Sequence, residues 1–259
     1  MGGHRVERRY CASTMPLQGY PLAEILPALA EAGFGAVELA TGHLDGLSAS
    51  SAAELQDAHG VKFRSLLSTD DIMVAGGREQ LADLVETAGR LAIPMVSVPS
   101  GGAEDASEED VSRCVDRLGV LAQRAERADV RLGLYAHEGS IGYSLARVAR
   151  ILDAIPSSAL GFYYSGYHFH RAGDSPVEAL GALAGRLCNV YFNCGVDPGG
   201  AGEPFWAPEM DLPAVCDALT RVGYDEEIML IYLGLDAKGP EPVIAGLTRA
   251  RDALDAMFS

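Results

Sequence analysis

The stretch SEEDVSRCVDRLGVLAQRAERADVRLGLYA, residues 107–136, joins one complete helix pattern to one strand pattern, and this combination decides the fold class. Ser107 stands before Glu108 and Glu109, which is the pattern of a helix N-cap followed by an acidic first turn. Apolar residues then recur three and four positions apart, as on the buried face of an amphipathic helix, at Val111, Val115, Leu118, Leu121, Ala122 and Ala125. The run Arg131–Ala136 follows, and we expect it to form a β-strand.

The same alternation of short strand patterns and longer helical patterns extends along the whole chain. The other strand-like runs are Arg9–Thr14, Ala36–Ala40, Lys62–Leu67, Met95–Pro99, Leu160–Tyr164, Cys188–Asn193 and Ile228–Tyr232. Eight units in 259 residues give about 32 residues each, close to the roughly 250 residues of a (β/α)8 barrel. A doubly wound open sheet alternates in the same way, but neither GxGxxG nor GxxxxGK(S/T) follows any of the runs. The sequence therefore predicts one α/β domain over residues 1–259, a (β/α)8 barrel.

Composition narrows the class of partner. The chain has 20 Lys and Arg against 36 Asp and Glu, a formal net charge of −16, which argues against nucleic acid and anionic membrane surfaces. Its five cysteines are odd in number and form no CxxC, so neither a disulfide scaffold nor a zinc ribbon is indicated. No apolar run is long enough to span a bilayer, and the N-terminus has no secretory signal pattern. We expect a cytoplasmic protein that acts on a small molecule.

Reactive residue types gather where the predicted strands end. A barrel of this kind has its active site at the C-terminal ends of its strands. The tails of the second, fifth, sixth and seventh runs are VELATGH, LYAHEGS, FYYSGYHFH and VYFNCG. Four of the six histidines lie in these tails, at His43, His137, His168 and His170. This clustering predicts a functional site.

Several segments resemble the xylose-isomerase-like sugar isomerase and epimerase barrels, which include tagatose epimerases and inosose dehydratases. The resemblance covers essentially the whole chain. It is carried by GFGAVEL (Gly33–Leu39), HEG after the fifth strand, GYHFHRAGDSP (Gly166–Pro176), RLCNVYF and MDLPAVCDALTRVGYDEEIML (Met210–Leu230). It implies a small-molecule substrate and is compatible with a homodimer, since members of the family are often dimers or tetramers.

The resemblance also implies a metal site, which this sequence does not retain. Family members bind one divalent ion with Glu, Asp, His and Glu from strands five to eight. Alignment of the flanking motifs places Tyr135, Ser165, Tyr191 and Tyr232 at these positions. A neutral phenol, with an ordinary pKa near 10, is a poor ligand for Mg²⁺ or Mn²⁺, although tyrosine does bind ferric iron. We therefore expect no metal and no cofactor. The three tyrosines should face inward and donate hydrogen bonds to a substrate oxygen, or else fill the pocket as packing.

Proton transfer would then fall to His137, His168 and Glu38. A single histidine is more often structural, but two in facing tails favour a role as general acid or base. Glu38 matches a family position that points into the barrel mouth, and its alternative is a structural ion pair with Arg64. If HFH at 168–170 is extended, His168 and His170 lie on one side, and a zinc site completed by His137 or Glu138 is a further alternative.

The remaining candidates are predicted to bind substrate. They are Ser165, Asn193, His43, Tyr164, Trp206, Glu138 and His170. Asn193 shares strand parity with Tyr191, and Trp206 lies in a long Gly/Pro-rich loop, residues 195–208, where its alternative is a loop anchor or an oligomer contact. An aromatic lining suggests a substrate with more apolar area than a bare sugar: Tyr163, Tyr164, Tyr167, Phe192, Phe205 and Trp206.

The sequence thus predicts a metal-independent isomerase or epimerase that uses histidine and glutamate for acid–base chemistry. A lyase or cyclase with the same site is one alternative. A ligand-binding descendant that has lost catalysis is another, because loss of metal ligands also accompanies loss of chemistry and fold alone does not establish activity.

Overall fold

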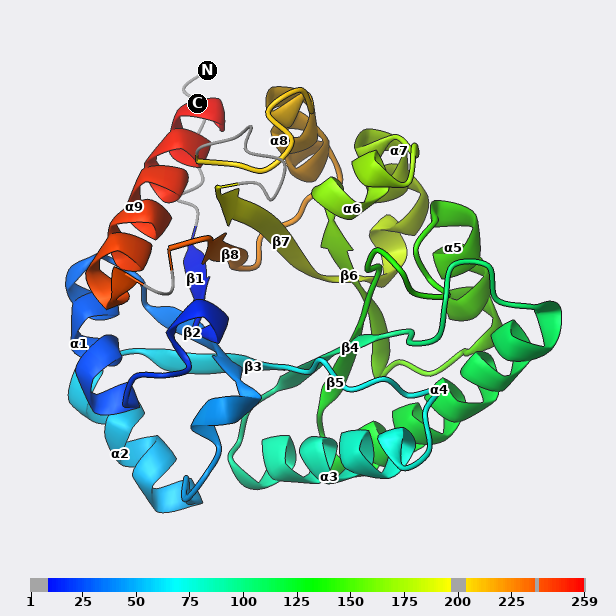
Figure 1. Cartoon of the computed structure of the whole chain (residues 1–259), viewed down its shortest axis with the longest axis horizontal. Coiled ribbons are helices and arrows are strands. Elements are labelled where there is room, and N and C mark those ends of the chain that lie inside the picture. Colours follow the sequence, from blue (N-terminus) through cyan, green and yellow to red (C-terminus); the bar gives the residue numbers. More distant parts are fainter. Residues whose placement is uncertain (1–8, 197–203, 236–237, 259) are drawn as a thin grey trace.

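The computed structural model describes residues 9–196, 204–235 and 238–258. Its strands form a closed parallel barrel in the order β1 to β8, and helices surround the barrel (Figure 1). The strands are β1 (Tyr10–Ser13), β2 (Ala36–Ala40), β3 (Lys62–Leu67), β4 (Met95–Pro99), β5 (Arg131–Tyr135), β6 (Leu160–Ser165), β7 (Leu187–Gly195) and β8 (Ile228–Leu233). The predicted (β/α)8 barrel is confirmed.

Helices follow the strands in turn. The α-helices are α1 (Leu22–Glu31), α2 (Ala49–His59), α3 (Gly77–Arg90), α4 (Glu108–Ala128), α5 (Leu145–Ala154), α6 (Gly166–Arg171), α7 (Pro176–Leu183), α8 (Leu212–Arg221) and α9 (Pro240–Met257). Short 3₁₀ helices are η1 (Met15–Leu17), η2 (Thr41–His43) and η3 (Ala184–Arg186). No helix in the described part of the chain is long and apolar enough to cross a membrane.

Helix α4 forms as its sequence pattern predicts. Ser107 is the N-cap, and it forms a capping box with Asp110, each side chain binding the backbone N–H of the other residue. The buried face consists of Val111, Cys114, Leu118, Leu121, Ala122 and Ala125. Val115 is only half-buried, and Cys114 takes its place on the buried face.

The strands divide the core into an inner and an outer part, because successive side chains of a strand point to opposite faces. The inner cluster consists of Cys11, Ala36, Tyr135, Tyr163, Tyr191, Met229 and Ile231. The register agrees with this grouping, since Tyr135 pairs with Tyr163 and Tyr191 pairs with Met229 on neighbouring parallel strands. The residues between them, such as Val190 and Leu230, belong to the larger cluster that packs under the helices.

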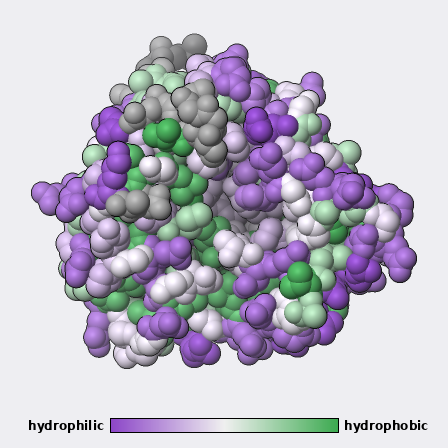
Figure 2. Space-filling view, viewed as in Figure 1, coloured by the Kyte–Doolittle hydropathy of each residue, from purple (hydrophilic) through white to green (hydrophobic). Residues whose placement is uncertain are grey.

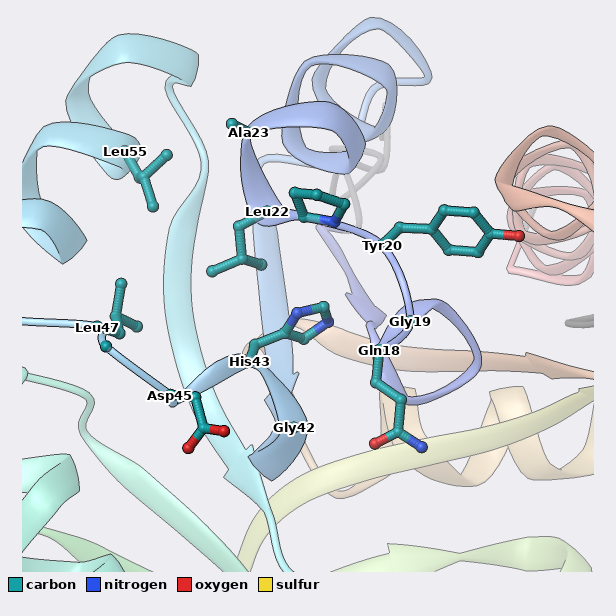
Figure 3. A pocket seen from close by; sticks show the side chains of 12 residues that line it. Gln18, Gly19, Tyr20, Leu22, Ala23, Gly42, His43, Asp45, Leu47 and Leu55 are labelled. Atoms are coloured by element: carbon teal, nitrogen blue, oxygen red, sulfur yellow. The ribbon is translucent and has the colours of Figure 1, made fainter.

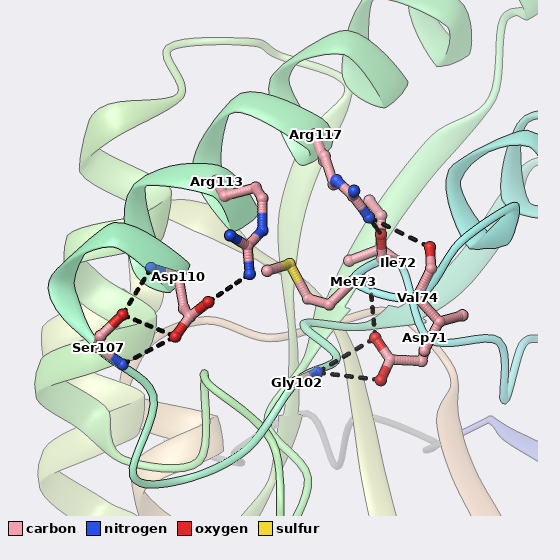
Figure 4. A network of polar contacts seen from close by, with 9 residues as sticks. All are labelled: Asp71, Ile72, Met73, Val74, Gly102, Ser107, Asp110, Arg113 and Arg117. Carbon is pink, nitrogen blue, oxygen red and sulfur yellow. Dashed lines mark hydrogen bonds and ion pairs between the residues drawn. The ribbon is translucent and has the colours of Figure 1, made fainter.

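Two loops on the C-terminal side of the barrel are tied together by one carboxylate (Figure 4). Asp71, after β3, accepts hydrogen bonds from the backbone N–H of Met73 at 2.7 Å and of Gly102 at 3.1 Å, and Gly102 lies after β4. Arg117 of α4 adds a hydrogen bond of 2.6 Å to the carbonyl oxygen of Ile72. Gly102 has a φ of +68°, which an L side chain rarely adopts, so glycine is required for this approach. The β3–α3 and β4–α4 loops therefore form one rigid wall.

Candidate active site

Three rings from two neighbouring strand ends form the centre of the candidate site. Tyr135 is the last residue of β5, His137 lies two residues further along the chain, and His168 lies in α6 directly after β6. The Tyr135 hydroxyl lies 2.8 Å from Nε2 of His168, within hydrogen-bonding distance. The His137 and His168 ring centroids are 4.6 Å apart. The structure therefore brings together three residues that the sequence analysis predicted to be catalytic.

His168 is buried and uncharged. Its side chain is 3% exposed, and burial, with a smaller contribution from nearby His137, lowers its pKa to about 3. A neutral imidazole has one N–H and one bare nitrogen, and Nδ1 of His168 has no partner among the described residues. A buried lone pair without a partner costs less than a buried N–H without one. We therefore assign the proton to Nε2, which donates a hydrogen bond to the Tyr135 oxygen, so that the Tyr135 O–H is a donor toward another acceptor.

His137 has the opposite environment. It is exposed, and its Nδ1 lies 2.7 Å from the carbonyl oxygen of Glu138. A carbonyl oxygen can only accept, so Nδ1 carries the proton in the neutral ring. Nε2 of neutral His137 therefore keeps its lone pair, as a general base requires.

Polar groups of β6 and β7 surround the Tyr135 hydroxyl. Ser165 Oγ donates to Asn193 Oδ1 at 2.8 Å, and both residues are buried. Burial raises the pKa of Tyr135, while hydrogen bonds with Asn193 and Ser165 act in the opposite direction. The phenol is thus protonated at neutral pH. The structure brings both predicted substrate-binding residues, Ser165 and Asn193, beside a predicted catalytic one.

Glu38 lies deeper, inside the barrel, and is fully buried. Tyr163 donates its hydroxyl to Oε1 of Glu38 at 2.8 Å, and Ser65 donates to the same oxygen at 3.0 Å. Burial raises the pKa of Glu38 despite these hydrogen bonds. The alternative ion pair with Arg64 is wrong, since Arg64 contacts Glu226 and Glu227 at the other end of the barrel.

Tyr191 contacts both Tyr135 at the barrel mouth and Tyr163 deeper in the barrel. Its ring centroid lies 5.5 Å from that of Tyr135 and 5.5 Å from that of Tyr163, in edge-to-face contacts. Burial and the nearby carboxyl group of Glu38 raise the pKa of Tyr191. Its predicted inward orientation is therefore confirmed.

Two tyrosines that were predicted to face the substrate, Tyr232 and Tyr164, point out of the barrel toward the helices, so these two predictions are wrong. Tyr232 packs under α9, where Arg249 donates to its hydroxyl at 3.0 Å and Gly246 leaves room for its ring. The inward positions of β8 are instead Met229, Ile231 and the neighbouring Leu233.

Tyr164 also lies outside the barrel. It stacks on Phe169 and donates to the carbonyl oxygen of Pro176, away from the predicted substrate. The third phenol of the interior is Tyr163, which the sequence analysis placed only in the aromatic lining. Its parity with Ser165, two residues further along β6, was the signal for its orientation.

The other predicted substrate-binding residues lie around or outside the mouth. Trp206 contacts the ring of Tyr167, which in turn contacts His168, each with centroids 5.1 Å apart. Glu138 pairs with Arg171 at 3.7 Å, and both side chains are exposed. His43 follows β2 and lines a separate cavity (Figure 3). Residues 197–203 of the loop predicted to be long lie outside the described residues.

His170 does not lie on the same side as His168. The segment is helical in α6, and residues two apart on a helix point in different directions. His170 pairs with Glu209 at 3.1 Å instead. The alternative of a zinc site on His168 and His170 is therefore wrong.

The donor set does not fit the divalent ion that the family resemblance implies. The corresponding positions of β5, β6 and β7 are Tyr135, Ser165 and Tyr191, and the inward positions of β8 are a thioether and aliphatic groups. Divalent ions of this kind need carboxylate or imidazole ligands. In residues 9–196, 204–235 and 238–258, no group of three or more His, Cys, Asp or Glu side chains is arranged to hold a metal ion.

The face that carries the C-terminal strand ends is hollowed near its centre (Figure 2). In parallel (β/α)8 barrels the active site lies at the C-terminal strand ends, which is where this chain carries its polar cluster. A family profile described as xylose isomerase-like TIM barrel matches residues 26–253, and the chain belongs to that family.

Solved structures agree on the fold. A protein named IOLI, with a bound zinc atom, has a TM-score of 0.79 at 18% identity, covering 97% of this chain and 99% of its own. The 3-keto-D-glucoside 4-epimerase YcjR from E. coli has a TM-score of 0.76 at 17% identity, with 95% and 100% covered. The probable 3-DHS dehydratase AsbF from Bacillus anthracis has a TM-score of 0.74 at 14% identity, with 94% and 98% covered. No curated protein sequence matches the chain.

Proposed function

We propose that this protein is a metal-independent isomerase or epimerase that acts on a small carbonyl compound at the barrel mouth. The observation that carries the proposal is the cluster of Tyr135, His168 and His137, in which an uncharged hydrogen-bonded pair lies beside an exposed imidazole. Family membership and the structural likeness to an epimerase support the reaction class.

Each residue has a distinct role in this proposal. Nε2 of His137 removes a proton from the carbon next to the substrate carbonyl, the electron pair of that C–H bond forms a carbon–carbon double bond, and the π pair of the carbonyl moves onto its oxygen. The Tyr135 O–H donates a hydrogen bond to the oxygen as its negative charge develops. His168 acts through Tyr135, because its Nε2–H orients the phenol. Tyr191 and Glu38 lie beneath Tyr135 and support its position.

The proton then returns to carbon. When the hydroxyl proton of the neighbouring carbon passes to the enolate oxygen and His137 returns its proton to the former carbonyl carbon, the product is an isomer. When solvent water protonates the original carbon on its opposite face and His137 releases its proton to solvent, the product is an epimer. An elimination would begin with the same proton removal, so a lyase differs only in the loss of a leaving group. The rings of Tyr167, Phe205 and Trp206 enclose a cavity of only about 10 Å³ beside Tyr191, so they pack as a wall and leave no room there for an apolar part of the substrate.

Solvent isotope exchange tests this proposal on a panel of carbonyl compounds. Hydroxyketones and ketoses with and without apolar substituents are incubated with the enzyme in D₂O and EDTA, and NMR detects deuterium beside the carbonyl. We expect exchange by the wild type and loss of exchange in H137Q, with H59Q, at the last residue of α2, as the matched control. Failure of every compound to exchange would favour the ligand-binding descendant. Exchange that requires added metal would contradict the proposal.

A further inference from the structure

The turn that carries His137 has a defined backbone geometry. The backbone N–H of Ser140 donates to the carbonyl oxygen of His137 at 3.1 Å, which closes a β-turn over residues 137–140. Gly139, at the third position of the turn, has a φ of +80°, whereas Glu138, at the second position, has a negative φ. This combination defines a type II turn, in which glycine is favoured at the third position. The backbone of Gly139 therefore determines how the peptide group between Glu138 and Gly139 is turned.

That peptide group is hydrogen-bonded on both of its sides. Its carbonyl oxygen, which belongs to Glu138, lies 2.7 Å from Nδ1 of His137. Its N–H, which belongs to Gly139, donates to Oε1 of Glu104 at 2.8 Å. Hydrogen bonds in series polarise one another, so the carboxylate makes the carbonyl oxygen a stronger acceptor for the ring N–H. The Glu104 carboxylate, in the β4–α4 loop, is thus connected to His137 through one peptide group.

Two buried serines fix the ends of the same turn. Ser140 Oγ donates to the carbonyl oxygen of His137 at 2.7 Å, and it accepts from Ser100 Oγ at 3.1 Å. Ser100 directly follows β4 and accepts from the backbone N–H of Gly142 at 2.6 Å. Both serine hydroxyls therefore donate and accept, and both side chains are buried. Only the middle of the turn, Glu138 and Gly139, is exposed and has room to change.

We propose that Gly139 and Glu104 are positioning residues for His137, which hold the intervening peptide group with its carbonyl toward Nδ1 and so keep the ring proton there and Nε2 bare. The flipped peptide of a type I turn would break both of its hydrogen bonds at once. An L side chain at position 139 favours that flip, because it disfavours a positive φ. The catalytic consequence rests on the proposed function, in which Nε2 of His137 removes the proton.

Alanine at position 139 tests the backbone without a steric clash. Apart from its chain neighbours, no atom lies within 4 Å of a Cβ added to Gly139, and the same holds for Gly60, which has a φ of +66° after α2. G139A and G60A should lose similar stability, but only G139A should alter His137. Asparagine tolerates a positive φ, so G139N should restore most of the wild-type behaviour. E104A removes the acceptor on the other side of the peptide group, and D105A is its control.

The ring ¹⁵N NMR resonances of the full chain measure the tautomer without substrate, at a pH where histidine rings are neutral. H137Q assigns the resonances of His137. We expect the proton on Nδ1 in the wild type, and in the G60A, G139N and D105A variants. In G139A and E104A the proton should exchange between Nδ1 and Nε2, because the acceptor that selects Nδ1 is displaced or weakened.

The deuterium-exchange reaction measures the catalytic consequence. Loss of one hydrogen bond in G139A should lower kcat about tenfold with little change in KM. The inference is overturned if the neutral wild-type ring carries its proton on Nε2, or if G139A keeps the wild-type tautomer. E104A decides the second point if G139A does not fold. Failure of the proposed function is distinguishable, since it appears as the absence of exchange in the wild type, whereas the tautomer is measured in either case.

Discussion

The ring of His137 lies against the ring of His168 at a centroid distance of 4.6 Å, although the two residues follow different strands. A positive charge on either ring disfavours a charge on the other, and this contributes to the low pKa of His168. The low pKa keeps the buried His168 ring neutral, and in the proposed mechanism this ring orients the Tyr135 phenol while the exposed His137 ring transfers the proton.

Removal of the Tyr135 hydroxyl should slow catalysis while preserving the fold. In Y135F we expect the turnover number to fall by about 10²-fold or more, because the developing oxyanion loses its donor, with a smaller change in KM. The deuterium-exchange rate measures this with the substrate that the exchange screen identifies. An unchanged rate would remove Tyr135 from the mechanism.

Removal of the Tyr232 hydroxyl should have the reverse effect. Y232F leaves the barrel mouth unchanged but removes the acceptor for Arg249 of α9. We expect a loss of about 1 kcal/mol in the free energy of unfolding and an unaltered exchange rate. Urea denaturation measures the free energy of unfolding. A tenfold loss of activity would show that Tyr232 affects the site.

Glu38 should destabilise the protein as the pH rises. Burial raises its pKa in the folded state, so the folded protein binds more protons than the unfolded chain above about pH 4.5. Stability from this group is present below the unfolded pKa and is lost as the pH rises through the folded pKa. E38Q keeps the acceptor for Tyr163 and should lack this dependence. The free energy of unfolding is measured against pH for the wild type and E38Q. Parallel curves above about pH 4.5 would contradict this prediction.

His168 should have the opposite dependence. Its pKa is about 3 in the folded state and about 6.5 in an unfolded chain, so the unfolded chain binds more protons between these values. Its contribution to stability is present above about pH 6.5 and is lost as the pH falls toward 3, with a slope of up to about 1.4 kcal/mol per pH unit. H168Q should have a shallower slope than the wild type in urea denaturation. Equal slopes would show that His168 is charged in the folded protein.

Metal removal should leave the proposed activity intact. The inward positions of β5 to β8 provide phenol, hydroxyl and aliphatic groups rather than carboxylates. We expect dialysis against EDTA to change neither the deuterium-exchange rate nor the melting temperature. Elemental analysis of protein purified without chelator provides the control, and stoichiometric zinc or manganese that is needed for exchange would contradict this prediction.

The sequence predicted the barrel because the periodicity of apolar residues and the length of each strand–helix unit point to the same fold along the whole chain. Ala36–Ala40, Lys62–Leu67 and Met95–Pro99 begin and end as predicted, and each is followed by Thr or Ser, where the strand gives way to a loop or a 3₁₀ helix. Cys188–Asn193 proved longer, as β7 is Leu187–Gly195, because its pairing with β8 continues to Gly195.

The site was harder to predict because it depends on side-chain direction. A one-residue error in matching the end of β8 places Tyr232 on the wrong face, since the side-chain period of a strand is two. Tyr163 was missed for the same reason. The helical conformation of Gly166–Arg171 separates His168 from His170, and a periodicity test has little power over six residues.

The carboxylate of Asp71 also limits where this protein can change its specificity. Because it fixes the loop after β3 to the loop after β4, a new side chain on either loop must be accommodated by both. Laboratory evolution toward other substrates should therefore accumulate its early substitutions on the opposite rim, among α6 and residues 204–211. Libraries confined to the Asp71 side should yield fewer variants with altered specificity than libraries on the opposite rim.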